Sequence, residues 1–221
     1  MESGSEKEAL FPPWTNTVLR VVLACLVLGA AFTFTFLFIF VRSPLYTGQF
    51  EPVTQPIEFD HRHHVGDAGI DCRFCHSTVE TAATAGFPST EVCMGCHNQI
   101  WNQSPLLQSV RASFYSGRPL VWRRVHELPD FAYFNHSIHV NKGVGCVTCH
   151  GRIDQMPAVM QQSPLTMSWC LDCHRDPKPN LRPHDRITDL AWQPSDPQAT
   201  GDRVATNNHL HTRTSCTTCH R

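Results

Sequence analysis

A Cys-x-x-Cys-His motif occurs five times in this chain of 221 residues, and no other feature constrains the fold as strongly. Each motif places two thiols one helical turn apart, with a histidine directly behind the second thiol. We number the motifs 1 to 5 in chain order: Cys72-Cys75-His76, Cys93-Cys96-His97, Cys146-Cys149-His150, Cys170-Cys173-His174 and Cys216-Cys219-His220. This is the attachment pattern of c-type haem, in which the thiols bond one porphyrin edge and the histidine ligates the iron. The sequence therefore predicts five covalently bound haem c groups.

Two other uses of paired cysteines are disfavoured by the same pattern. Tetrahedral zinc sites combine two Cys-x-x-Cys pairs, or one pair with two histidines, and place no demand on the residue after the second cysteine. Here histidine follows in all five motifs. Disulfides within the motifs are excluded as well, because thioether bonds to haem consume the ten thiols.

The composition indicates that cofactors fill the interior. The chain has 16 prolines and 12 glycines, which suit a conventional side-chain core poorly. We expect a multihaem c-type cytochrome of short helices and Pro- and Gly-rich coil with little or no sheet, with helices at the motifs and at 106–113, and we expect no folding without haem. The formal net charge of −1 gives no support to nucleic-acid binding.

An uncharged apolar run from Val21 to Val41 stands between Arg20 and Arg42. As a helix it is about 30 Å long, which matches the hydrocarbon layer of a membrane. A cleaved signal peptide has a shorter apolar run and a small-residue cleavage site, which the exit at Ser43-Pro44 lacks. We therefore predict one retained transmembrane helix at 21–41.

Haem is attached covalently on the outer side of the cytoplasmic membrane, and this sets the expected topology. Residues 1–20 form a cytoplasmic segment, and residues 42–221 form a periplasmic pentahaem domain. The chain is then a single-pass protein of the bacterial inner membrane with its N-terminus inside.

A repeated box of the form Phe-x-His-x-x-His-Val precedes motifs 1 and 2 and again motifs 3 and 4, at 59–65 and 134–140. The repeat divides the haem domain into two-haem modules at about 57–100 and 126–178, with the fifth site at about 207–221. Histidines three apart on a short helix project to nearly one side, so one box can serve two neighbouring haems. The predicted distal iron ligands are His61, His64, His136 and His139.

A fifth distal ligand is still required. We favour His126, which lies in the ordered-looking segment Val125-His126-Glu127-Leu128-Pro129. The other candidates stay open at this point: His63, His184, His209, His211, Met156, Met160 and Met167.

Three segments carry a family resemblance: the first box with Gly69 to His76, the run from Val125 to Val140, and Trp169 to Arg175. Together they resemble the pentahaem cytochrome subunit (ActA) of bacterial alternative complex III, over the anchor and nearly the whole haem domain. The box spacing is also similar to that of small cytochromes of the c3 and c7 type, in which the two histidines serve different haems.

The resemblance implies a quinol-oxidising respiratory or photosynthetic membrane complex. Its partners would be an iron-sulfur subunit, polytopic membrane subunits and a monohaem cytochrome, with electrons leaving to a periplasmic carrier or a terminal oxidase. On this interpretation the chain is an electron-transfer subunit with no catalysis of its own.

Two alternative functions predict features that this sequence lacks. A free-standing anchored multihaem quinol dehydrogenase, which feeds periplasmic reductases, predicts a haem motif close behind the membrane helix, whereas residues 42–71 separate the anchor from motif 1. A multihaem reductase for a small molecule such as nitrite requires an open iron and often a modified motif. All five motifs here end in histidine.

Overall fold

The structure is a computed structural model, and it describes residues 11–220. The chain divides into two compact units, with the boundary between Thr47 and Gly48. We call residues 48–220 the haem domain. The first ten residues of the expected cytoplasmic segment lie outside the described residues.

The first unit contains α1 (Trp14–Phe40) and the short α2 (Pro44–Thr47). Helix α1 begins directly after Pro13, where a missing N–H costs nothing. Helix α1 thus starts at Trp14, seven residues before Val21, where the predicted transmembrane span begins. Among the described residues it is the one helix long and apolar enough to cross a membrane, and none of its residues is buried.

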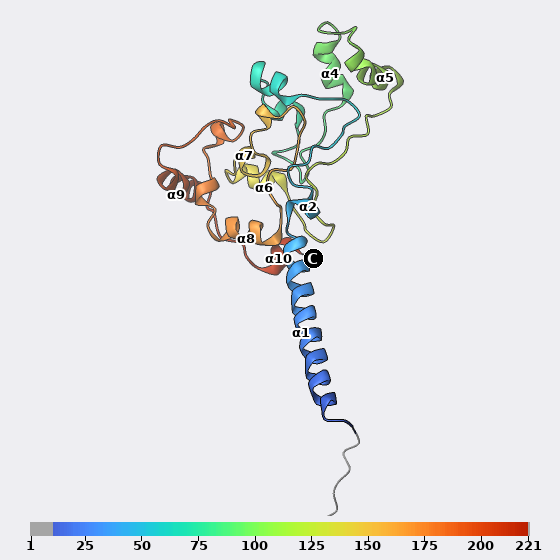
Figure 1. Cartoon of the computed structure of the whole chain (residues 1–221). Coiled ribbons are helices and arrows are strands. Elements are labelled where there is room, and N and C mark those ends of the chain that lie inside the picture. The colour runs from blue at the N-terminus through green and yellow to red at the C-terminus, as the bar shows by residue number, and fades with distance from the viewer. Residues whose placement is uncertain (1–10, 221) are drawn as a thin grey trace, which may run out of the picture. The chain divides into compact units, whose positions relative to one another are not determined.

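The haem domain is built from short helices joined by long stretches of coil (Figure 1). Between residues 48 and 220 the structure contains no strand, only two isolated bridges, Pro52 with Met160 and Val144 with Leu181. This confirms the expected fold class. The elements are η1 (Arg62–Asp67), α3 (Cys72–Cys75), α4 (Thr90–His97), η2 (Pro105–Leu107), α5 (Gln108–Ser116), α6 (His136–Asn141), α7 (Cys146–His150), η3 (Ile153–Gln155), α8 (Met167–Arg175), η4 (Lys178–Asn180), η5 (His184–Arg186), α9 (Pro197–Asn207) and α10 (Cys216–Cys219).

Few apolar side chains in the haem domain are buried. Those that are buried are spread over many elements instead of forming one cluster: Met94, Val110, Val140, Met156, Leu181, Ile187, Leu190 and Val204. Meanwhile large aromatic side chains such as Phe74 and Phe131 are more than half exposed. A domain of this size normally buries far more apolar surface, so the protein part alone supplies only a thin core.

Helix α9 was not predicted, because the region around Pro194 and Pro197 reads as a surface connection. The Asp196 side chain caps the helix by accepting a 2.9 Å hydrogen bond from the Ala199 N–H, and Pro197 occupies the first turn. Gly201 lets α9 approach the backbone carbonyl of Lys178 in η4. The cap and the proline are sequence signals that could have revealed this helix.

Candidate haem sites

Each motif lies on a short helix that carries both of its cysteines. Motifs 1, 3 and 5 form α3, α7 and α10, and motifs 2 and 4 end the longer α4 and α8. Two of these helices have side-chain caps. Asp71 accepts a hydrogen bond of 2.9 Å from the Arg73 N–H at α3, and Thr166 accepts one from the Trp169 N–H at α8. The helical turn brings the two thiols of a motif to one side, as thioether attachment requires.

Seven histidines of the motifs and boxes share one hydrogen-bond arrangement, in which ring Nδ1 faces a backbone carbonyl oxygen. A carbonyl can only accept, so Nδ1 carries the proton and Nε2 keeps the lone pair that binds a metal. The pairs are His64 with Asp60 (3.0 Å), His76 with Gly86 (2.8 Å), His97 with Ile100 (3.0 Å), His136 with Ala83 (3.1 Å), His139 with Asn135 (2.8 Å), His174 with Arg213 (2.8 Å) and His220 with Phe131 (3.0 Å).

The second histidine of each box faces the histidine of the second motif in its module. The ring centroids of His64 and His97 are 6.0 Å apart at an interplanar angle of 63°. Those of His139 and His174 are 6.0 Å apart at 64°. Because a metal–imidazole nitrogen bond is about 2 Å long, two imidazoles on opposite sides of one iron have centroids roughly 6 Å apart. Both pairs therefore fit a shared iron.

The two boxes also have the same internal geometry. Phe59 packs against His61 and His64 with centroid distances of 4.7 and 4.3 Å. In the second box, Phe134 packs against His136 and His139 at 4.7 and 4.5 Å. The phenylalanine thus holds both imidazoles of its box in place. The sequence repeat is a repeat in space, although the first box forms a π-helical turn (η1) and the second an α-helix (α6).

The first histidine of each box lies near the first motif of a module. The rings of His136 and His150 have centroids 6.4 Å apart and are nearly parallel, at 14°. By the symmetry of the boxes, His61 corresponds to His136, and we expect it to lie opposite His76. Burial, followed by the nearby His76, lowers the pKa of His61 to about 4. His61 is thus neutral at pH 7, as a metal ligand must be.

The structure places His126 beside motif 3. Its ring centroid is 4.2 Å from that of His150, and no contact with motif 5 is described for it within residues 11–220. Burial lowers the pKa of His126 to about 4 and that of His150 to about 3. Ligation by His126 remains a prediction. Of the alternatives, His184 lies 3.4 Å from Glu80, and His63 is exposed and pairs with Asp67 at 2.9 Å.

Two buried side-chain polar atoms within the described residues lack a hydrogen-bond partner: His61 Nδ1 and His126 Nε2. An unpaired buried polar atom is costly, so its presence in a native site calls for a missing partner. Both atoms belong to predicted iron ligands. The free His126 Nε2 fits a haem iron. His61 would bind iron through its other ring nitrogen, Nε2, as the seven histidines above would.

Sequence reasoning did not identify the groups that position these ligands. Arg182 is buried, donates to the Asp189 carbonyl at 2.7 Å, and packs against Gly145 just before motif 3. The carbonyl partners of the histidines are equally unmarked, because a backbone carbonyl has no sequence signature.

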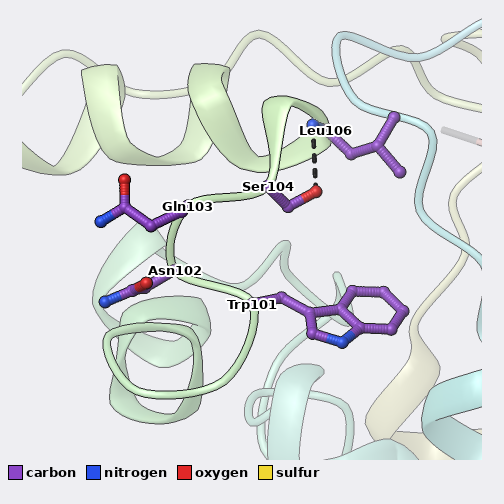
Figure 2. Close-up of a pocket in the computed structure, with 5 residues that line it drawn as sticks. All are labelled: Trp101, Asn102, Gln103, Ser104 and Leu106. Carbon is purple, nitrogen blue, oxygen red and sulfur yellow. Dashed lines mark hydrogen bonds between the residues drawn. The ribbon is translucent and has the colours of Figure 1, made fainter.

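An open hollow follows motif 2, and Figure 2 shows its lining: Trp101, Asn102, Gln103, Ser104 and Leu106. Ser104 accepts a hydrogen bond of 3.3 Å from the Leu106 N–H and starts η2. Trp101 is 65% exposed and has a positive φ of 55°. The hollow contains none of the predicted iron ligands.

Comparison with known proteins agrees with the haem assignment. Residues 132–221 match the family described as cytochrome c7 and related cytochrome c. Over 97 residues the chain is 38% identical to the multihaem cytochrome c subunit of menaquinone reductase from Nitratidesulfovibrio vulgaris. That alignment covers 43% of this chain and 45% of the relative, so the match spans less than half of either protein. The chain therefore carries a helical multihaem cytochrome c domain, and this kind of domain implies covalently bound haem c.

Proposed function

We propose that this protein is a five-haem electron-transfer subunit of a quinol-oxidising membrane complex of the alternative complex III kind. The observation that carries the proposal is the paired arrangement of imidazoles, repeated at His64 with His97 and at His139 with His174. Histidine on both sides of an iron leaves no position for substrate and suits electron transfer. Five motifs in one small domain support closely spaced carriers.

The anchor supports a place within a membrane assembly. Helix α1 can span the bilayer once, and covalent haem attachment requires the haem domain on the periplasmic side, with the N-terminus inside. The relative is itself named as a subunit of a larger enzyme. The partners we propose are an iron-sulfur subunit, polytopic membrane subunits and a monohaem cytochrome, with a periplasmic carrier or terminal oxidase as the electron acceptor.

Haem stoichiometry and ligand binding test this proposal on the full-length protein in detergent. Haem content per chain, from the alkaline pyridine spectrum and the intact mass, should be five. Carbon monoxide should shift the reduced spectrum of at most one haem. Fewer than five haems, or carbon monoxide binding to most of them, would contradict the proposal. Affinity purification from the native membrane should then recover the other subunits.

A second candidate is a free-standing anchored quinol dehydrogenase. The name of the relative, menaquinone reductase, favours quinone chemistry near this cytochrome. The two candidates differ in what the isolated chain does. A purified chain that oxidises menadiol with a soluble electron acceptor at a rate matching the native membrane would support the second candidate, and an inactive chain supports the subunit.

A further inference from the structure

Motifs that belong to one module lie side by side. In the first module the Cys75 and Cys93 thiols lie close enough to interact electrostatically. His76 also donates a hydrogen bond to the carbonyl of Gly86, which precedes α4. In the second module Cys149 neighbours the thiols of Cys170 and Cys173. A hollow between α7 and α8, lined by Thr148, Trp169 and Cys173 among others, agrees with this contact. Motif 1 therefore adjoins motif 2, and motif 3 adjoins motif 4.

The two modules meet through motifs 1 and 3. The thiols of Cys72 and Cys146, the first cysteines of these motifs, lie against each other. Asp71, directly before motif 1, accepts a 2.8 Å hydrogen bond from Thr188, while Ile187 accepts one of 3.1 Å from the Cys146 N–H. The neighbouring residues Ile187 and Thr188 thus contact both motifs: Thr188 bonds to Asp71 before motif 1, and Ile187 to Cys146 of motif 3.

The second box is also fixed to the first module. The backbone N–H and ring Nδ1 of His136 both donate to the Ala83 carbonyl, at 3.1 Å. Asn141 donates to the Glu80 carbonyl at 2.9 Å. Both carbonyls lie in the loop between motifs 1 and 2, on the side near His76. Within residues 48–220, no hydrogen bond, ion pair or ring contact joins motif 2 to motifs 3, 4 or 5.

Motif 5 lies beside motif 4. The ring of His174 donates from Nδ1 to the carbonyl of Arg213, on the approach to motif 5, at 2.8 Å. The Cys170 and Cys219 thiols also lie close enough to interact electrostatically. The other contacts of motif 5 are with the segment before the second box, where Phe131 accepts from His220 and Tyr133 donates to the Cys219 carbonyl.

We propose that the five haem attachment sites form one unbranched row in the spatial order 2–1–3–4–5. Motifs 2 and 5 are then the two ends, where electrons enter and leave, and motifs 1 and 3 form the one haem-to-haem link between the modules. Chain order would instead place motif 2 beside motif 3. This inference rests on the five-haem proposal and adds the path through it.

The test is proton NMR of the unaltered, fully reduced full-length protein in detergent. Each haem is assigned to its motif through the thioether-bonded cysteine protons. The row predicts nuclear Overhauser effects between the haems of motifs 1 and 3, together with those of the pairs 1–2, 3–4 and 4–5, and none between motifs 2 and 3. Contacts between haems 2 and 3 without contacts between 1 and 3 would overturn the order. A protein with fewer than five haems would contradict the proposed function itself, so the two failures are distinguishable.

Matched ligand variants give a second readout. Methionine in place of a distal histidine raises the reduction potential of that haem, so it takes up the first electron. That electron changes the magnetic and electrostatic surroundings of adjacent haems. In His64→Met, one-electron reduction should shift the haem resonances of motif 1 alone. In His139→Met, the matched variant of the second box, it should shift those of motifs 3 and 5. Two shifted neighbours in His64→Met, or only one in His139→Met, would overturn the proposed row.

Discussion

A backbone carbonyl orients an imidazole without placing a formal charge beside it, whereas a carboxylate partner adds a negative charge and makes the ring a stronger donor to the metal. In this protein the histidines of motifs 1, 2, 4 and 5, the predicted proximal ligands, all use carbonyls. Substitution of any single side chain therefore leaves these orienting groups in place. The side chains whose substitution changes the ligation of an iron are therefore the distal histidines.

Removal of one distal histidine should open one iron. In His64→Ala the haem of motif 2 loses the ring that faces His97 at 6.0 Å, so reduced protein should bind carbon monoxide at one haem. His63→Ala is the matched control, because His63 is the neighbouring, exposed ring and pairs with Asp67. Carbon monoxide difference spectra measure both. Equal carbon monoxide binding by the two variants would refute ligation by His64.

His126 can be tested in the same way. Its Nε2 is buried without a partner beside His150, so His126→Ala should convert one haem from low spin to a form that binds carbon monoxide, if His126 is an iron ligand. His184→Ala is the control, since His184 is an open candidate from the sequence and faces Glu80. An unchanged ferric spectrum of His126→Ala would show that another residue is the fifth distal ligand.

Among the elements, α3 depends most on its cap, because four residues make almost no internal hydrogen bonds. Asp71 caps α3 and binds Thr188. Asp71→Ala should therefore lower the free energy of unfolding by about 1 kcal/mol, measured by denaturant titration of the holoprotein. The control is Asp185→Ala, which removes an exposed carboxylate that makes only a 3.5 Å ion pair. Equal losses in both variants would contradict the capping role.

The same carboxylate gives the wild-type protein a pH dependence. The hydrogen bond from Arg73 lowers the pKa of Asp71 from 3.8 to about 2, against the opposing effect of burial. The unfolded chain thus binds this proton at higher pH than the folded chain does. The stabilisation is complete above the unfolded pKa and declines as the pH falls from about 4 to about 2. Over that interval, unfolding free energies of wild type and Asp71→Ala should converge, and a constant difference would contradict this assignment.

Helix α9 depends on Gly201, where a Cβ atom would collide with the Lys178 carbonyl of η4. Gly201→Ala should push α9 away from η4 and lower the free energy of unfolding by about 1–3 kcal/mol. Gln198→Ala, on the exposed part of the same helix, should change it little. Thermal unfolding of the two holoproteins measures the difference, and a stable Gly201→Ala variant would show that α9 and η4 do not pack as described.

The sequence predicted elements with a local chemical signature and missed those that depend on distant contacts. The expected helices at the motifs follow from attachment chemistry, and the structure contains them, while the helix expected at 106–113 is the turn η2 followed by α5. The π turn of the first box was not predicted. It ends with hydrogen bonds from the Ala68 and Ile70 N–H groups to the carbonyls of His63 and His64, and backbone bonds of this kind have no sequence signature. The proximity of His126 to His150 depends on how the chain crosses between modules, which no spacing rule encodes.

For the whole molecule, the two units obtain their stability from different sources. Helix α1 has no buried residues, and its backbone hydrogen bonds are internal, so a membrane or micelle is sufficient for it. The haem domain has a thin apolar core, and its half-buried rings of His61 and His150, whose pKa values are lowered to about 4 and about 3, are neutral at pH 7. Its stability must therefore come largely from the haem groups and their bonds to the motifs.

This difference predicts how the chain behaves without haem. When the full-length chain is produced in cells that lack cytochrome c maturation and is purified in detergent, amides of residues 48–220 should exchange hydrogen rapidly, because too little apolar surface is buried to offset the chain entropy. Amides of α1 should stay protected by the micelle, which makes the anchor an internal control. The holoprotein should show slow exchange in both units, slowest near motifs 1 and 3, where two haems and both modules meet. Slow exchange in the haem-free domain would mean that side-chain packing alone specifies the fold, and the haems would then be cargo of a preformed scaffold instead of its core.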